Sequence, residues 1–487
     1  MNSSPNNWNA QVRRAKIVCT LGPASRSPTV IDHLMRAGMD VARLNFSHGT
    51  QEEHARAITL IRATSGRQEK PIGILADLQG PKIRTGALEG GRSVNLRADN
   101  RFTITTADAQ GNSEGVSISY KRLPAEVHKG DRILLADGLI ELRVLSTTRQ
   151  RIVCRVMNGG ELREHQGVNL PGVKLRIPAV TEKDLDDLHF ALKSGVNYIG
   201  VSFVRTADDI LAAKAAMHKA GRKVPIIAKL EKPEAIDNLA EILEVAEGVM
   251  VARGDLGVEM SPERVPVIQK MVIAQAREAR VPVITATQML ESMTHNPRPT
   301  RAEASDVANA IFDGSDAVML SAETATGRYP VESVKMMDRI VREAEGSVTQ
   351  YVRPHRRALL SLAETTAELI CHASEELSMK VIAVFTESGS SARLISKHRP
   401  RPPIIAFSRS QETRRQITLL WGVLPRKAAI LRDIDDMAHI AERRLLEEGL
   451  VRQGDLVGMV AGTPLGVGGT TNFMKFHIIG GGEQVWR

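Results

Sequence analysis

Residues 226–231 read Ile-Ile-Ala-Lys-Leu-Glu, an apolar run that acquires charge only towards its end. Strands of parallel sheets show this nearly continuous apolar pattern, because both faces of such a sheet are covered. Seven further short runs share it, and amphipathic stretches separate several of them. Eight strands alternating with helices predict a (β/α)₈ barrel, an α/β fold. The predicted barrel strands are 16–20, 41–47, 72–77, 198–203, 226–231, 248–252, 283–287 and 317–321.

The alternation is interrupted once, after the third predicted strand. From about residue 82 to residue 178 helical periodicity vanishes, and runs of alternating polarity are separated by Gly, Asp and Asn turns. We interpret this stretch as a small inserted β-barrel domain with Pro81 and Pro178 as hinges, placed to act as a lid. Its predicted strands are 101–106, 115–120, 131–145 and 151–157.

A new αβ rhythm begins after about Ser347 and predicts an open, mostly parallel α/β sheet. The expected strands are 381–386, 404–408, 455–460 and 473–479, and the expected helices are 363–377, 391–398, 412–421 and 434–448. The predicted parts are a tail (1–13), a catalytic barrel (14–80 and 179–346), the lid (81–178) and a C-terminal α/β domain (347–487).

The composition is that of a globular protein of about three domains, with 487 residues, 42% hydrophobic and 25% charged. No long apolar run and no signal-like N-terminus are present, so we expect a cytoplasmic protein without membrane contact. Three scattered cysteines argue against disulfides and structural zinc. The net charge of +9 is spread evenly and aromatics make up only 3%, which favours an anionic small molecule over nucleic acid.

Polar side chains gather where the predicted barrel strands end, which is where barrel enzymes carry their active sites. Residues i and i+2 of a strand share a face, so Arg43, Asn45 and Ser47 point together, as do Lys229 and Glu231. Arg and Lys suit phosphate and carboxylates suit Mg²⁺, so the set indicates phosphoryl transfer. The other strand ends carry Asp77, Gly254, Asp255, Thr287, Ser321 and Glu323.

Each of these residues taken singly has a simpler explanation. Lys229 could be a salt-bridge partner, Asp255 a helix cap and Asn45 a turn residue. Their convergence on one mouth of the predicted barrel favours the functional interpretation.

At these residues the sequence resembles the pyruvate kinases, from about Arg14 to the C-terminus. The resemblance implies a barrel with an inserted β lid and a C-terminal α/β domain. It also implies transfer of the phosphoryl group of phosphoenolpyruvate to ADP, giving pyruvate and ATP in the last step of glycolysis, with Mg²⁺ or Mn²⁺ as cofactor. A homotetramer is implied as well. The motifs are 16–23 (KIVCTLGP), 43–49 (RLNFSHG), 80–86 (GPKIRTG), 167–172 (GVNLPG), 252–257 (ARGDLG) and 286–293 (ATQMLESM).

The resemblance also implies residue roles. Arg43 would contact the phosphoryl group, Lys229 would stabilise the phosphoryl in flight and the enolate, and Thr287 would help to deliver a proton. Glu231 and Asp255 would hold the divalent metal. The substrate-binding set would further include the N–H groups of Gly254 and Asp255, together with Ser321 and Glu323, and the nucleotide-binding set Asn45, His48 and Arg84.

Two positions depart from the family pattern. Members that need K⁺ hold it with residues matching Asn45, Ser47, Asp77 and the carbonyl of Leu78. Here Leu78 and Lys82 stand where those members have Thr and Glu, and an ammonium could supply the missing charge, so we expect weak or absent K⁺ dependence. The alternative, that Lys82 points to solvent and K⁺ still binds, stays open. Gln166 replaces a Lys that contacts the nucleotide, which removes one charge interaction with ADP.

A hydroxyl-rich junction in the C-terminal domain suggests an effector site. Thr386, Ser388, Gly389, Ser390 and Ser391 end a predicted strand and open a helix, where a phosphate can be cradled, although a plain turn would also explain them. The stretch 462–472 could form a second wall. Glu387 adds negative charge, so we expect a monophosphate such as glucose 6-phosphate, ribose 5-phosphate or AMP.

Two other classes of protein could share parts of this pattern. A barrel lyase or aldolase acting on a 2-oxo acid could use the same carboxylates with Lys229 as acid or base, but it would not need Arg84 or the lid. A non-catalytic sensor of phosphorylated metabolites would not need Lys229, Glu231 and Asp255 together.

Overall fold

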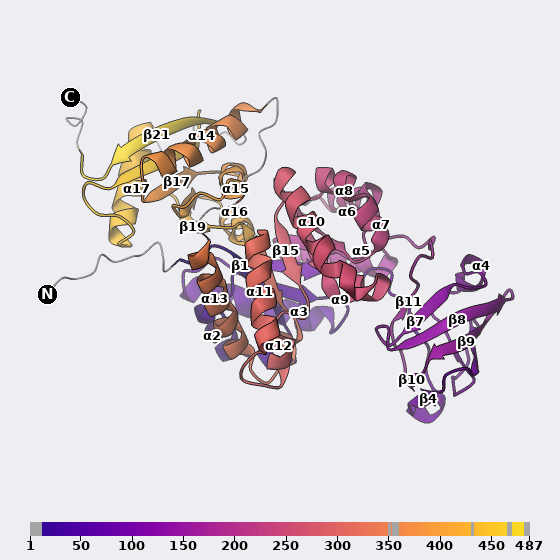
Figure 1. Cartoon of the computed structure of the whole chain (residues 1–487). Coiled ribbons are helices and arrows are strands. Elements are labelled where there is room, and N and C mark those ends of the chain that lie inside the picture. The colour runs from indigo at the N-terminus through magenta and orange to yellow at the C-terminus, as the bar shows by residue number, and fades with distance from the viewer. Residues whose placement is uncertain (1–11, 349–351, 353–359, 430–432, 465–469, 482–487) are drawn as a thin grey trace.

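A closed barrel of eight parallel strands forms the centre of the computed structural model (Figure 1). The structure describes residues 12–348, 352, 360–429, 433–464 and 470–481. Each strand matches a predicted run to within about two residues, so the predicted barrel is confirmed. The strands, in their hydrogen-bonded order, are β1 (Lys16–Leu21), β16 (Ala317–Leu320), β15 (Val283–Ala286), β14 (Gly248–Ala252), β13 (Ile226–Leu230), β12 (Tyr198–Val201), β3 (Gly73–Asp77) and β2 (Val41–Asn45).

Alternate residues of the barrel strands serve two cores. On β1, Val18 lies in a cluster with Leu75 and Met250 inside the barrel, whereas Ile17 and Cys19 pack with the helices outside. This two-sided burial explains why the strands are apolar almost throughout. Cys19 is fully buried.

Helices surround the barrel, and several begin with a capping box in which side chain and backbone satisfy each other. Thr50, Thr181 and Thr300 do this with the acidic residue three positions on. The longer helices are α2 (Pro28–Ala37), α3 (Gln51–Arg67), α5 (Glu182–Lys193), α6 (Ala207–Lys219), α10 (Val265–Glu278), α11 (Arg301–Asp313) and α13 (Pro330–Ser347). Shorter ones are α7 (Pro233–Asp237), α8 (Leu239–Val245), α9 (Arg253–Glu259), α12 (Ala322–Ala325), η1 (Pro23–Ser25), η3 (Pro262–Arg264) and η4 (Glu291–Thr294).

The inserted segment folds into β strands that project from one side of the barrel (Figure 1). A six-stranded sheet has the order β11 (Val168–Asn169), β7 (Arg132–Leu135), β8 (Ile140–Thr147), β9 (Arg151–Asn158), β5 (Arg101–Thr105) and β6 (Gly115–Ser117). A small second sheet pairs β4 (Val94–Leu96) with β10 (Gly160–Leu162), and η2 (Glu89–Gly91) and α4 (Leu123–Glu126) complete the lid.

The single strand predicted over 131–145 was wrong, because β7 and β8 form a hairpin there. The turn between them contains three successive residues with positive φ, at Ala136, Asp137 and Gly138. Asp-Gly is a common hairpin turn signal that the alternating pattern on either side concealed.

The C-terminal segment forms an open, mostly parallel sheet, as predicted, but with five strands instead of the four expected. Its order is β19 (Val423–Lys427), β18 (Ile404–Ser408), β17 (Val381–Phe385), β20 (Leu456–Gly462) and β21 (Thr471–Ile478), and only β21 runs antiparallel. Its helices are α14 (Leu362–Glu376), α15 (Ser390–Lys397), α16 (Gln411–Gln416), η5 (Ile417–Leu419) and α17 (Ile434–Glu447).

One helix and one strand of this sheet differ from the prediction. The helix expected over 412–421 stops at Gln416 and continues as a 3₁₀ turn, and β19 was not predicted. Its sequence, Val-Leu-Pro-Arg-Lys, is too polar to read as a buried strand. It lies at the edge of the sheet, where Pro is tolerated.

Most of the predicted N-terminal tail and part of the stretch 462–472 lie outside the described residues. Within the described part of the chain, no helix has the length and apolar character needed to span a membrane.

A buried ion cluster joins the barrel to the C-terminal domain. The carboxylate of Asp316, at the start of β16, accepts from Lys397 Nζ at 2.6 Å and from Arg399 Nη2 at 3.1 Å. All three residues are buried. Burial would raise the pKa of Asp316, but Lys397 and Arg399 outweigh it and hold that pKa below its ordinary value.

We predict that Asp316→Asn destabilises the protein by about 3–5 kcal/mol, because two buried cations lose their counter-charge. Thermal unfolding followed by circular dichroism measures this as a fall in Tm of several degrees. Asp108→Asn removes an ion pair whose carboxylate is 98% exposed and serves as the control, with little expected change. Equal Tm values for the two variants would contradict the prediction.

Candidate active site

The centre of the barrel mouth is a buried network around Asp77, the last residue of β3. Its Oδ2 accepts from Arg43 Nε at 2.7 Å, and its Oδ1 lies 3.3 Å from Lys229 Nζ. Lys229 Nζ also lies 2.8 Å from Glu231 Oε1 and donates to Ser202 Oγ at 2.7 Å. Four predicted site residues from three strands therefore meet at one point.

The carboxylates keep the ammonium of Lys229 charged. Burial alone would lower the pKa of Lys229, but the charges of Asp77 and Glu231 outweigh it and raise that pKa above its ordinary value. The pKa of Asp77 shifts the other way, because Lys229 and Arg43 overcome the effect of its own burial and lower it. The mouth therefore contains two permanent cations at physiological pH.

Glu231 and Asp255 form the carboxylate pair predicted to hold the metal. Burial raises the pKa of Glu231, Lys229 opposes this, and the negative charge of Asp255 adds to it. Glu231 Oε2 also accepts from the backbone N–H of Phe203 at 2.8 Å. No group of three or more His, Cys, Asp or Glu suited to a metal occurs among the residues that the structure describes. Two carboxylates suit Mg²⁺, which commonly takes its remaining ligands from substrate and water.

Thr287 and Gly254 meet beside this pair. Thr287 Oγ1 accepts from the N–H of Gly254 at 2.8 Å, so this N–H, predicted to bind the substrate carboxylate, is engaged by a neighbour. Thr287 has φ 70° and Gln288 has φ 54°. Positive φ is costly for a β-branched residue and is typical of functional sites.

Ser321 and Glu323 lie at the end of β16. Both oxygens of the fully buried Glu323 accept backbone N–H groups, from Leu290 at 3.0 Å and from Ser321 at 2.7 Å. Burial raises the pKa of Glu323. Its carboxylate thus joins the loops after β15 and β16. The hydroxyl of Ser321 is buried without a hydrogen-bond partner in the described structure.

A second group of cations borders the mouth where the lid begins. The pKa of His48 is lowered, first by partial desolvation and then by the positive charges of Lys82, Arg84 and Arg43. Arg84 Nη1 donates to the lid carbonyl of His165 at 3.0 Å. The predicted nucleotide residues His48 and Arg84 therefore share one positive field.

The residues matching the K⁺ ligands lie around Asp77. Asn45 Oδ1 accepts from the N–H of Ser47 at 3.1 Å, and the carbonyl of Leu78 accepts from Ser202 Oγ at 2.7 Å. Asp77 Oδ1 is buried and, among the described residues, has no hydrogen-bond partner beyond its 3.3 Å ion pair with Lys229. This oxygen therefore lacks a conventional hydrogen bond, although Lys229 balances its charge.

The predicted effector loop has the expected strand-to-helix geometry. Gly389 has φ 84°, and its N–H donates to Thr386 Oγ1 at 2.9 Å, while Ser391 Oγ lies 2.6 Å from Thr471 Oγ1. Glu387 lies 3.2 Å from Arg409 Nε. This ion pair offsets the negative charge that was expected to disfavour a bisphosphate.

Two residues of the network were missed by the sequence analysis. Ser202 follows β12 and links Lys229 to the carbonyl of Leu78, and Thr20 on β1 accepts from Arg43 Nη1 at 2.9 Å. Neither strand end carries a charged residue, and the motif 16–23 that contains Thr20 does not by itself assign that hydroxyl a role. A hydroxyl residue at the end of an apolar barrel strand is the signal that would have found them.

Comparison with known proteins identifies the family. A model of the pyruvate kinase barrel domain matches residues 12–334, and one of the pyruvate kinase alpha/beta domain matches 364–477. Pyruvate kinases of Staphylococcus aureus strains USA300 and NCTC 8325 are each 46% identical over 474 residues, which is 96% of this chain and 81% of theirs. A crystal structure of a pyruvate kinase from Cryptosporidium parvum superimposes with a TM-score of 0.91 at 36% identity, covering 97% of both chains. This chain therefore belongs to the pyruvate kinase family.

Proposed function

We propose that the network of Arg43, Asp77, Lys229 and Glu231 is the phosphoryl-transfer centre of this enzyme. The reaction is that of the pyruvate kinase family, in which phosphoenolpyruvate and ADP give pyruvate and ATP. One observation carries the proposal. The carboxylate of Asp77 pairs with two buried cations, Arg43 and Lys229, and Lys229 also pairs with Glu231, one of the two carboxylates of the predicted metal site. Phosphoryl transfer needs this combination of positive charge and metal-type ligands.

Arg43 and Lys229 neutralise the phosphoryl group as it moves. Their positions are fixed in advance by Asp77, so little reorganisation is needed when charge develops. Because Lys229 stays protonated, it also stabilises the enolate oxygen left by the transfer. Thr287, held in its strained conformation, positions the water that delivers a proton to the enolate carbon.

Glu231 and Asp255 hold Mg²⁺ or Mn²⁺. When bound, the metal supplies positive charge to the oxygens of the transferred group and orients them. The N–H groups of Asp255 and Gly254 orient the substrate carboxylate, the latter being shared with Thr287 Oγ1, while Ser321 and Glu323 hold the neighbouring loops in position. His48 and Arg84, with Asn45 nearby, bind the ADP phosphates from the side of the lid.

The remaining assignments concern the whole protein. We infer a cytoplasmic homotetramer with a tail (1–13), a barrel (14–80 and 179–346), a lid (81–178) and a C-terminal domain (347–487). Residues 386–391 bind a phosphorylated effector, and its effect on the active site passes through contacts between subunits.

The first experiment measures pyruvate formation in a lactate dehydrogenase-coupled assay with phosphoenolpyruvate, ADP and Mg²⁺. We expect ADP-dependent pyruvate, and a loss of kcat of at least about 10²–10³-fold in Lys229→Met, because one fixed charge at the transferred group disappears. Lys335→Met, an exposed lysine on α13, is the matched control. Pyruvate formation without ADP, or full activity of folded Lys229→Met, would refute the assignment.

We further propose that the ammonium of Lys82 supplies the positive charge that K⁺ supplies in other members of the family. We expect the rate in tetramethylammonium buffer to equal the rate in K⁺ buffer to within about twofold. The double variant Leu78→Thr/Lys82→Glu, which restores the family pattern, should become K⁺-dependent. A large loss of wild-type activity on K⁺ removal would show that Lys82 has no such role.

Effector binding at residues 386–391 is tested by the saturation curve for phosphoenolpyruvate. We expect glucose 6-phosphate, ribose 5-phosphate or AMP to shift the curve of the wild-type enzyme. Ser390→Asp puts a negative charge at the start of α15 and should abolish the shift. Curves that never move, or that move equally in the variant, would exclude this loop.

A further inference from the structure

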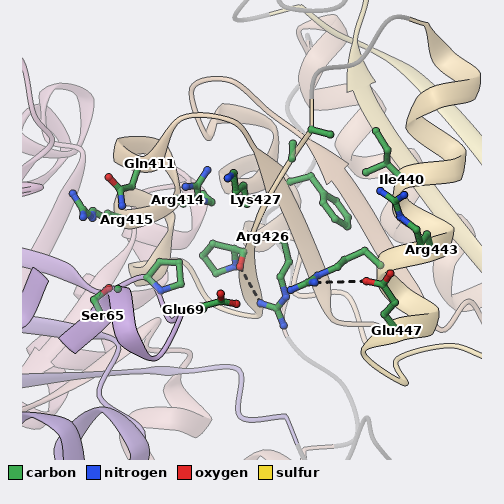
Figure 2. A pocket seen from close by; sticks show the side chains of 17 residues that line it. Ser65, Glu69, Gln411, Arg414, Arg415, Arg426, Lys427, Ile440, Arg443 and Glu447 are labelled. Carbon is green, nitrogen blue, oxygen red and sulfur yellow. Dashed lines mark hydrogen bonds and ion pairs between the residues drawn. The ribbon is translucent and has the colours of Figure 1, made fainter. Parts of the chain in front are cut away.

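A hollow of about 630 Å³ lies between the C-terminal domain and the barrel (Figure 2). Its barrel wall is the end of α3 and the turn before β3, represented by Ser65, Glu69 and Pro71. Its other walls come from α16, β19 and α17. The active-site network lies at the opposite ends of the barrel strands, and no residue of the 386–391 loop lines the hollow. It is therefore a site apart from both.

The basic character of the hollow follows from helix geometry. On α16, Gln411, Arg414 and Arg415 stand at positions i, i+3 and i+4, which share one face of a helix. On α17, Arg443 and Glu447 share a face in the same way. Figure 2 shows Arg414 and Arg415 on one side of the hollow and Arg443 on the opposite side, with Lys427 and Arg426 between them. Two helices and a strand thus turn cations towards one space.

The positive charge of the hollow is not balanced. Six arginine and lysine side chains line it, against two glutamates. Glu448 pairs with Arg426 at 2.7 Å and with Arg444 at 2.7 Å, which accounts for two of the six cations. The other four, Arg414, Arg415, Lys427 and Arg443, form no ion pair with any of the described residues.

The acidic residue of α16, Glu412, compensates this charge only in part. Glu412 pairs with Arg222 of the barrel at 3.0 Å. The pKa of Arg415 is lowered, first by burial and then by the charge of Arg414. Burial, Arg415 and Arg222 likewise lower the pKa of Arg62, to about 9. Arg414 and Arg415 therefore repel each other at the wall of the hollow, and an anion would relieve this repulsion.

We propose that this hollow is a binding site for a small metabolite that carries a phosphate ester. One guanidinium group can donate two parallel hydrogen bonds to two oxygens of the same phosphate. A phosphate ester carries between one and two negative charges at neutral pH. The cations stand on opposite sides, so they can hold a phosphate and a second polar group of the same molecule. Pro425 and Ile440 give the hollow apolar wall surface for the uncharged part. The volume is sufficient for a sugar phosphate or a nucleoside monophosphate.

Binding is measured by isothermal titration calorimetry on the full-length enzyme carrying Ser390→Asp, which removes the effector loop from the measurement. The probes are glucose 6-phosphate, AMP and inorganic phosphate, so that sugar and nucleotide sources are distinguished. We expect one site per chain for at least one ester. Adding Arg415→Gln/Arg443→Gln should weaken it at least tenfold.

Two control variants keep the test specific. Arg452→Gln removes an exposed arginine of the same domain outside the hollow and should leave binding unchanged. Arg415→Lys/Arg443→Lys keeps the charge and should retain most of the binding. Circular dichroism melting and turnover of phosphoenolpyruvate verify that every variant is folded. Failure of all three probes to bind, or affinity that does not respond to Arg415→Gln/Arg443→Gln, would overturn the proposal, whatever the outcome of the activity assays.

Discussion

One buried carboxylate, that of Asp77, organises the mouth of this barrel. A buried charge must be paired, and Asp77 is paired by Arg43 from β2 and by Lys229 from β13, two strands away. Lys229 reaches it because β12, the strand between, has Gly200 opposite Asp77. A Cβ at Gly200 would lie only 3.0 Å from Asp77 Oδ1. The ion pairs of Asp77 therefore constrain the positions of β2, β3 and β13, and of β12 between the last two. Arg43 and Lys229 are thus oriented before any substrate binds.

The lid adds charge at the edge of this network without entering it. It contacts the barrel through Asn169, whose side chain donates to Glu259 at 2.8 Å, and Glu259 also pairs with Lys232 at 2.6 Å. Close to the hinge at Pro178, Arg205 donates to the lid carbonyls of Leu175 and Ile177, both at 3.0 Å. These few polar contacts bind the lid less extensively than the cores bind each domain. A change in the angle of the lid would thus move Arg84 while leaving Asp77 and its partners in place.

The sequence predicted best what burial and alternation determine, and less well what depends on tertiary contacts. The eight barrel strands were found because both faces of each are covered, and the charged ends of β2 and β13 marked the site. The hairpin of β7 and β8 and the edge strand β19 were missed, since a local turn and an exposed edge leave little periodic signal. Ser202 was missed for another reason. Its importance comes from Lys229, 27 positions later in the chain, and only the folded barrel brings the two within 2.7 Å.

The C-terminal domain contacts the barrel at the N-terminal ends of β3 and β12, whose C-terminal ends lie at the active site. The hydroxyl of Tyr198, at the start of β12, donates to the carbonyl of Gln416 on α16. Gly73, at the start of β3, leaves room for the carbonyl of Arg415, which a Cβ there would approach to 3.1 Å. β3 ends at Asp77 and Ser202 follows β12, and strands paired on both sides are stiff. α16 also carries Thr413, whose hydroxyl donates to the carbonyl of Glu387 in the loop 386–391. One short helix therefore connects that loop, the basic hollow and the strands of the active site, so a displacement of α16 would be felt at all three.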